Sequence, residues 1–329
     1  MIGADALAQR EGWNGWLGGG TPLGDTMMVK VLGSAAGGGF PQANCNCRNC
    51  ADVRAGKPGL IPRTQSSLAV TATGERWVLL NASPDIRQQI AATPTLAPRP
   101  DGGARSSPIA AVALTNADVD HVTGLLSLRE GLSFTLYASA RVLDTLAANS
   151  IFNVLSPRDV ARTALPLGRP MQVAGGLAIR AYPVPGKVAL YLEDANRGLV
   201  AGEGDGIGLE VSEPATGAAF HYIPGCAGVD AALAQRLAGA RLVLFDGTLY
   251  TDDEMITRGL SDKSGQRMGH ISMSGPLGSM AAFAALDVER RIYVHINNSN
   301  PVLRDDSPER ADVQRAGWEI AYDGMEIGL

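Results

Sequence analysis

Short apolar runs alternate with polar, glycine-rich and proline-rich segments along most of the chain. Apolar runs of about four to eight residues that end at turn residues are typical of β-strands. Two such runs, at residues 66–72 and 76–81, flank Thr73-Gly74-Glu75, a segment that predicts a hairpin turn. Further strands are predicted at residues 29–32, 109–114, 134–138, 177–184, 209–211, 220–223, 242–246 and 291–296.

Helices are predicted between these strands at residues 85–92, 124–130 and 140–149. Two runs of strands, each interrupted by helices, predict two sheets that pack face to face with helices outside, because each sheet must bury one face. Residues 1–26 are rich in glycine and show no such periodicity, so we interpret them as a poorly ordered amino-terminal extension. Residues 27–329 are then a single domain.

Composition excludes several classes of protein. The 329 residues are 45% hydrophobic and 19% charged, as in ordinary soluble globular proteins. A net charge of −5 and a pI near 5.4 give no reason to expect a nucleic acid or an anionic membrane as partner. The chain has no apolar run near the roughly 20 residues that span a bilayer, and its start lacks the features of a secretory signal. We therefore expect a cytoplasmic protein with reduced or metal-bound cysteines.

Three cysteines stand close together in the loop at residues 44–50. Cys45, Cys47 and Cys50 are more typical of zinc ligands than of disulfide partners in a cytoplasmic protein. The competing interpretation is three buried or free thiols. A tetrahedral structural Zn2+ site needs a fourth ligand, and the sequence leaves open whether Cys226 supplies it or is a small core residue.

One apolar run ends in a short polar segment that contains Asn116, Asp118, Asp120 and His121. Sheets of α/β proteins place their chemistry just past the carboxyl ends of strands. The adjacent Asp120 and His121 offer a carboxylate oxygen and an imidazole nitrogen, which iron, manganese and zinc all accept. The competing interpretation is that Asp120 caps a helix and His121 is a surface residue.

Residues 115–124 keep the frame of the Thr-His-x-His-x-Asp-His-x-x-Gly motif and resemble the metallo-β-lactamase superfamily. Other stretches resemble the branch of that superfamily that acts in pyrroloquinoline quinone (PQQ) biosynthesis, and the likeness runs from about residue 28 to the carboxyl end. It implies an α+β fold, a four-layer αββα sandwich. The stretches are residues 33–39, 44–47, 81–87, 115–121, 221–226, 268–270 and 295–298.

The departures from the superfamily pattern concern its metal ligands. Its hydrolases hold two metals, but Asn116 and Asp118 stand here in place of the first two motif histidines. Gly186 stands where a further histidine is expected, and Pro224 and Gly225 follow the strand that leads to a bridging aspartate in the hydrolases. The resemblance thus implies a single remaining site, made by Asp120, His121 and His295.

Two histidines and one carboxylate on one face of a metal leave positions open, as in non-haem Fe2+ oxygenases. A two-metal hydrolase needs a paired clamp, so a zinc hydrolase with unusual ligands is disfavoured. We expect Fe2+ at this site, with Zn2+ as its substitute in purified protein. The resemblance implies O2-dependent hydroxylation of the tyrosine ring of a small, Glu-Tyr cross-linked PQQ precursor. The alternative is a non-catalytic carrier involved in transport of PQQ or its precursor to the periplasm.

Further residues are assigned supporting roles. His270, which follows Met268-Gly269, is a candidate acid or base, or else a helix-start residue held by backbone. Asp246 is predicted to orient a ligand or His270, or to form a turn. Asp118 either hydrogen-bonds a ligand or caps the turn, and His221, within a strand, is expected to be a packed side chain.

The resemblance also bears on the structural Zn2+ site. Relatives from phosphonate breakdown have a histidine where this chain has Asn298, so Asn298, Cys226 or a water completes the site. The sequence leaves the oligomeric state open, with a homodimer as the candidate.

Overall fold

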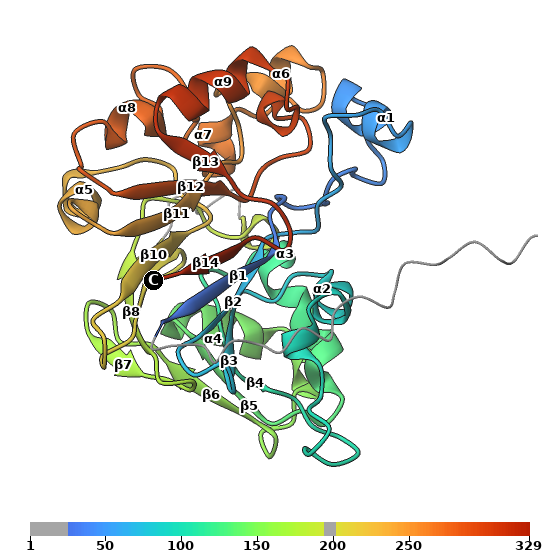
Figure 1. Ribbon diagram of the computed structural model, residues 1–329, viewed down its shortest axis with the longest axis vertical. Coiled ribbons are helices and arrows are strands. Elements are labelled where there is room, and N and C mark those ends of the chain that lie inside the picture. The colour runs from blue at the N-terminus through green and yellow to red at the C-terminus, as the bar shows by residue number, and fades with distance from the viewer. Residues whose placement is uncertain (1–25, 194–201) are drawn as a thin grey trace, which may run out of the picture.

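The computed structural model describes residues 26–193 and 202–329. The predicted amino-terminal extension therefore lies, apart from residue 26, outside the described residues. Two seven-stranded sheets face each other, and helices cover both outer faces (Figure 1). This arrangement confirms the predicted α+β four-layer sandwich.

The first sheet has the strand order β14-β1-β2-β3-β4-β5-β6. Strands β14, β1, β2 and β3 pair antiparallel, whereas β3 to β6 pair in parallel. Parallel neighbours need crossover connections, which carry helices on the outer face. The strands are β1 (Met28–Gly33), β2 (Ser67–Thr71), β3 (Trp77–Leu80), β4 (Ile109–Ala113), β5 (Phe134–Ala138), β6 (Val160–Ala164) and β14 (Glu326–Gly328).

The second sheet has the order β13-β12-β11-β10-β9-β8-β7 and divides in the same way. Strands β7 to β10 pair antiparallel, and β10 to β13 pair in parallel. Its strands are β7 (Pro170–Gln172), β8 (Ala178–Pro183), β9 (Ile207–Ser212), β10 (Ala219–Ile223), β11 (Leu242–Asp246), β12 (Arg290–Val294) and β13 (Trp318–Ile320).

The central strands are apolar on both faces because both faces are covered. In β4, Ala111 and Ala113 join the apolar cluster between the sheets, and Val112 joins the cluster beneath the helices of the first sheet. In β11, Leu244 faces the other sheet and Phe245 packs under the helices of the second. The core is thus divided into three apolar layers, one between the sheets and one outside each.

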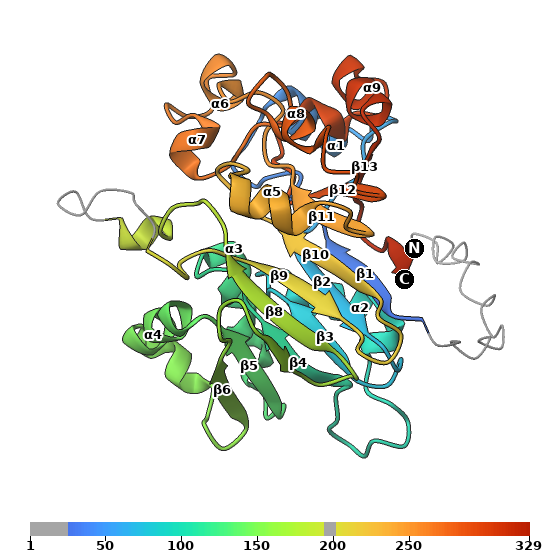
Figure 2. The ribbon, with the colours of Figure 1, turned by 90° about the vertical axis from the view of Figure 1, so that its left-hand side faces the viewer.

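Helices α2, α3 and α4 pack on the first sheet, and α5, α8 and α9 on the second, as Figure 2 shows for α4 and for the α5–α9 group. None of the described helices is long and apolar enough to cross a membrane. The α-helices are α1 (Arg48–Arg54), α2 (Ile86–Ala92), α3 (Val119–Val122), α4 (Ala140–Ala148), α5 (Ala231–Leu237), α6 (Glu254–Thr257), α7 (Gly265–Met268), α8 (Ser279–Phe283) and α9 (Pro308–Arg315). The 3-10 turns are η1 (Pro94–Leu96), η2 (Thr123–Arg129), η3 (Ser150–Val154), η4 (Leu190–Leu192) and η5 (Pro301–Leu303).

Three kinds of difference separate the predicted elements from the observed ones. The helix predicted at residues 124–130 is the 3-10 turn η2. Strands β6, β7, β13 and β14 lie at sheet edges and were not predicted, because short edge strands need little apolar sequence. In β7, for instance, two of the three residues are exposed. Helices α1, α3 and α5 to α9 were also not predicted.

Candidate metal centre

The three predicted active-site ligands meet where strands of the two sheets end. Asp120 and His121 lie on α3, shortly after β4 of the first sheet, and His295 follows β12 of the second. One ligand atom from each lies within 4.8 Å of the others. Because α3 is short and begins only a few residues beyond β4, it holds both of its side chains at the sheet's carboxyl edge.

The imidazole of His295 is held from both sides. Its Nε2 lies 3.0 Å from Oδ2 of Asp120, and its Nδ1 lies 2.9 Å from Oγ1 of Thr248. Burial by itself would lower the pKa of His295, but the Asp120 carboxylate raises it above its ordinary value. The His295 backbone has φ of +56°, an uncommon conformation for a residue other than glycine. Such backbone persists where surrounding contacts fix it, and the Thr248 hydroxyl also lies 3.0 Å from the His295 carbonyl oxygen.

His121 presents one ring nitrogen without a partner. Its Nδ1 lies 2.7 Å from Oδ1 of Asn116 and 3.4 Å from Oγ1 of Thr115. With a proton on Nδ1, which donates to Asn116, the lone pair is left on Nε2. That Nε2 is buried, has no hydrogen-bond partner among the described residues, and lies 3.9 Å from Oδ2 of Asp120. A buried, unpartnered lone pair beside a carboxylate fits a bound cation.

Asp118 contacts Asn116, which in turn contacts the donor His121. It accepts a hydrogen bond from Nδ2 of Asn116 at 2.9 Å, and its backbone N–H donates to Oδ1 of Asn116 at 3.0 Å. Asn116 stands in the position of the first motif histidine. Because its Oδ1 hydrogen-bonds Nδ1 of His121, it supports that ring. Asp118 steadies that support and lines the cavity beside the donors, and it makes no side-chain cap on α3.

A second group shares His295. One ligand atom from each of Asp246, His270 and His295 lies within 4.8 Å of the other two. Oδ2 of Asp246 lies 2.7 Å from Nδ1 of His270, and the His270 and His295 rings stack with centroids 5.3 Å apart. Burial would raise the pKa of Asp246, but the nearby His270 lowers it. Asp246 therefore contacts His270, one of the two partners that the sequence analysis gives for it.

Thr248 was not identified from the sequence. Its hydroxyl lies 2.7 Å from Oδ1 of Asp246, 3.1 Å from Nδ1 of His270 and 2.9 Å from Nδ1 of His295. It therefore links the buried Asp246 carboxylate to both histidines. Its position two residues after Asp246 at a strand end was the one available signal.

A cavity of about 510 Å³ opens over the donors. This volume lies within the range of about 300–1,000 Å³ that is usual for small-molecule sites. The described part of its wall includes Asp120, His121, His270 and His295. The apolar part of the wall comes from Val119, Leu190, Tyr191, Met255 and Met268.

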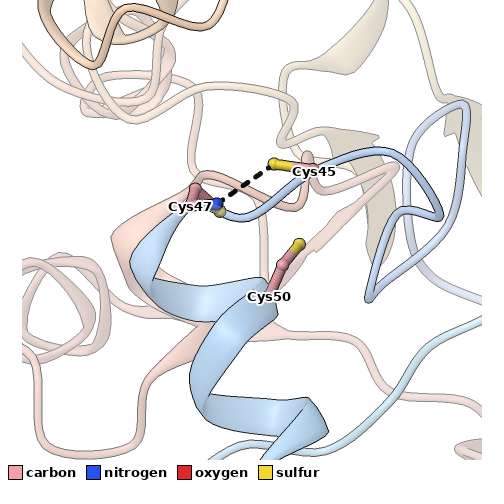
Figure 3. A group of neighbouring side chains, drawn as sticks. All are labelled: Cys45, Cys47 and Cys50. Carbon is pink, nitrogen blue, oxygen red and sulfur yellow. Dashed lines mark hydrogen bonds between the residues drawn. The ribbon is translucent and has the colours of Figure 1, made fainter.

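The three cysteines of the 44–50 loop form a separate group (Figure 3). The Sγ atoms of Cys45, Cys47 and Cys50 all lie within 4.8 Å of one another, at the start of α1. Burial raises the pKa of Cys47 to about 11. Burial also opposes ionisation of Cys45, yet the Cys47 backbone N–H donates to its sulfur and its pKa is lowered. A thiolate surrounded by further sulfurs suits Zn2+.

The side chain of Asn298 faces all three sulfurs. Its Nδ2 lies 3.1, 3.7 and 3.3 Å from Sγ of Cys45, Cys47 and Cys50. The two ends of a carboxamide exchange on rotation, so its oxygen can face a cation from this position. Cys226 is the wrong candidate for the fourth ligand: its thiol donates to the Gly228 carbonyl at 3.0 Å, outside the cysteine group.

His221 is a packed side chain, as predicted. Its Nδ1 lies 2.9 Å from the Tyr182 hydroxyl, and it belongs to no donor group among the described residues.

Comparison with known proteins agrees with this geometry. The family model of the Beta-lactamase superfamily domain matches residues 76–296. Coenzyme PQQ synthesis protein B of Xanthomonas oryzae pv. oryzae (strain MAFF 311018) is 52% identical over 306 residues, covering 92% of this chain and 100% of that relative. The protein of the same name from Rhodopseudomonas palustris (strain BisB5) is 52% identical over 310 residues, with the same coverage. The chain belongs to the coenzyme PQQ synthesis protein B family.

Solved structures agree with this membership. The crystal structure of Zn2+-bound PqqB from Methylobacterium extorquens has a TM-score of 0.88 and 50% identity, and covers 92% of this chain and 100% of its own. A diphosphatase from the PhnP family has a TM-score of 0.65 at 18% identity, covering 92% and 97%, and shares the fold alone. As a member of the coenzyme PQQ synthesis protein B family, the chain has a role in PQQ biosynthesis and carries residues suited to metal binding.

Proposed function

We propose that this member of the coenzyme PQQ synthesis protein B family is an Fe2+-dependent, O2-using hydroxylase. Its substrate is the Glu-Tyr cross-linked precursor of PQQ, and the tyrosine ring is the position that gains oxygen. The observation that carries the proposal is the donor set of Asp120, His121 and His295, which lie together and line a cavity.

The donor set suits a single iron. Two imidazole nitrogens and one carboxylate are the ligands of mononuclear Fe2+ oxygenases, and a metal held on one face supplies open positions for O2 chemistry. At the superfamily's first site, Asn116 stands in place of a motif histidine and hydrogen-bonds His121. A paired-metal hydrolase is therefore disfavoured.

The remaining residues support binding and proton movement. Thr248 and Asn116 hold Nδ1 of His295 and Nδ1 of His121, which fixes the other nitrogen of each ring toward the cavity. Asp246 engages Nδ1 of His270, so Nε2 of His270 is the atom that exchanges a proton with the substrate. The apolar wall excludes water from the ring that reacts.

Each turnover inserts one oxygen atom of O2 into an aromatic C–H bond, so two turnovers would add two oxygens. The second oxygen atom leaves as water, with two protons and two electrons from an added reductant. The test is an anaerobic Fe2+ titration of the protein, followed by O2 uptake and product mass with the precursor and a reductant. Wild type, Asp120→Ala and His295→Ala are compared, with Arg158→Gln, an exposed residue outside the cavity, as the matched control.

We expect a mass gain of one or two oxygens that needs Fe2+ and is lost in both metal-site variants. Metal-free Asp120→Ala protein that still hydroxylates the precursor would exclude the proposal. Tight precursor binding without O2 consumption, and with no effect of His295→Ala, favours the carrier instead. The homodimer and the cytoplasmic location stay predictions, which size-exclusion chromatography and cell fractionation test.

A further inference from the structure

Three cationic side chains line the cavity in addition to the metal donors. Lys187, Lys263 and Arg267 line its wall, together with the carboxylate of Glu193. Lys187 follows β8, Glu193 directly follows η4, and Arg267 lies on α7 with Lys263 just before it. The mechanism described above uses none of these four side chains.

Two of the cations already hold a carboxylate. Nη2 and Nη1 of Arg267 donate to Oε2 and Oε1 of Glu193 at 3.1 and 3.3 Å, the parallel geometry by which arginine binds carboxylates. Nζ of Lys187 lies 3.7 Å from Oε1 of the same group. The Arg267 hydrogen bonds lower the pKa of Glu193, so that carboxylate is charged at neutral pH. This part of the wall is therefore built to surround a carboxylate.

Lys263 adds a third cation to this part of the wall. Among the residues the structure describes, it has no carboxylate within ion-pair distance, and Glu193 is the carboxylate that pairs with Lys187 and Arg267. The side chains of Lys187 and Glu193 are only 17% and 16% exposed, so their charges are screened less than charges on the open surface. The cluster of Lys187, Lys263 and Arg267 favours a ligand with carboxylates of its own.

Asp118 and Asp120 line the same cavity. A bound divalent cation would offset the charge of Asp120, one of its donors. A ligand with both an aromatic ring and carboxylates could place its carboxylates at Lys187 and Arg267 and its ring at the donors, because both groups line one cavity. The apolar side chains Leu190, Tyr191 and Met268 line the same cavity.

The positively charged wall also adjoins the proton-transfer histidine. Gly269 has φ of +85°, and a Cβ at that position would lie 2.8 Å from Cγ of Lys187. Glycine therefore lets the Lys187 stem pack against the backbone that carries His270. A carboxylate bound by Lys187 would stand close to the group that exchanges a proton with the ring.

We propose that Lys187, Lys263 and Arg267 form a carboxylate-binding subsite that selects the amino-acid-derived precursor and orients its ring toward Asp120, His121 and His295. The inference rests on the proposed function, because it takes the precursor as the ligand. Its test measures binding rather than turnover, so failure of hydroxylation and failure of this subsite give different results.

The experiment is calorimetric titration of anaerobic, Fe2+-loaded protein with the Glu-Tyr cross-linked precursor and with its carboxyl methyl ester. The variants are Arg267→Gln and Lys187→Met, which keep stem length and remove charge, with Arg158→Gln as the control. Hydrogen bonds to charged groups suggest that each cation variant weakens precursor binding by about tenfold to hundredfold. The methyl ester should bind weakly, and equally, to wild type and variants.

The direction of the affinity change in Glu193→Gln decides between a binding role and a structural role. It removes the internal carboxylate and frees both cations, so we expect the precursor to bind several-fold more tightly. If Glu193→Gln weakens binding as Arg267→Gln does, the ion pair is structural and the subsite is refuted. Unchanged affinity in Arg267→Gln and Lys187→Met refutes it as well, as does a wild-type protein that binds precursor and ester alike. Thermal unfolding of each variant verifies that the fold is kept.

Discussion

Asp120 and His295 lie 3.0 Å apart, Oδ2 to Nε2, although 175 residues separate them in the chain. Asp120 is carried by the first sheet and His295 by the second, so this contact joins the two halves of the sandwich. The donor set exists only when the sheets pack against each other. Metal that binds there therefore stabilises the packed state by linkage, since the unfolded chain has no such site.

Replacing Thr248 by valine should weaken the metal centre. The change keeps the shape of the side chain but removes the hydroxyl that holds Nδ1 of His295. Loss of such supporting hydrogen bonds typically lowers metal affinity by about 10- to 100-fold. Competition with a chelator for Fe2+ under anaerobic conditions measures the effect. Thr248→Ser, which keeps the hydroxyl, is the control, and wild-type affinity in Thr248→Val would contradict the role.

Replacing Gly124 by alanine should destabilise the segment that carries the donors. An added Cβ would meet the backbone carbonyl oxygens of Ser83 and Ala82, which cannot rotate away. Ala82 also donates its N–H to the carbonyl of His121 at 2.8 Å, so the strain reaches the ligand segment. Overpacking of this kind costs about 1–3 kcal/mol of the free energy of unfolding.

Urea unfolding of the metal-free protein measures this cost. Gly228→Ala is the matched control, because an added Cβ there meets no atom within 4 Å. Equal unfolding midpoints for Gly124→Ala and wild type would show that the loop at residues 82–83 moves freely.

Replacing Asn298 by histidine should tighten zinc at the cysteine group. Asn298 faces all three sulfurs, and an imidazole nitrogen is a much better zinc ligand than a carboxamide oxygen. We expect about a tenfold or larger gain in zinc affinity, measured by competition with a chelator. A tenfold gain corresponds to about 1.4 kcal/mol of binding free energy. Asn44→His adds a histidine to the same loop outside the sulfur group and is the control. Faster zinc loss from Asn298→His would place the fourth ligand elsewhere.

Protonation of His221 should lower the free energy of unfolding in mild acid. Burial, aided by the charges of Arg236 and Arg180, lowers its pKa to about 4. The unfolded chain, with an ordinary histidine pKa of about 6.5, then binds more protons than the folded one between about pH 6.5 and pH 4. The free energy of unfolding therefore decreases as the pH falls through this window, by up to about 3 kcal/mol.

Substitution of His221 by asparagine removes this proton uptake and keeps a polar partner for Tyr182. The urea midpoint of His221→Asn should be lower than that of wild type at pH 7 and should depend less on pH between about 6.5 and 4. Parallel pH profiles for the two proteins would show that His221 is not the titrating group.

Local patterns in the sequence determined much of the fold. Buried central strands such as β4 and β11 are continuous apolar runs, and such runs stand out without knowledge of their neighbours. The adjacent Asp120 and His121, and the three cysteines of the 44–50 loop, are also local, because their spacing within a few residues already brings their side chains together.

Only the tertiary structure decided which distant residues complete each group. Asn298 rather than Cys226 faces the cysteines, and Thr248 lies between Asp246 and His295. These contacts depend on how two sheets pack and where their strands end, and residue spacing carries no information about that. Short edge strands such as β7 escaped prediction for a related reason: pairing with a neighbouring strand, rather than apolar sequence, holds them in place.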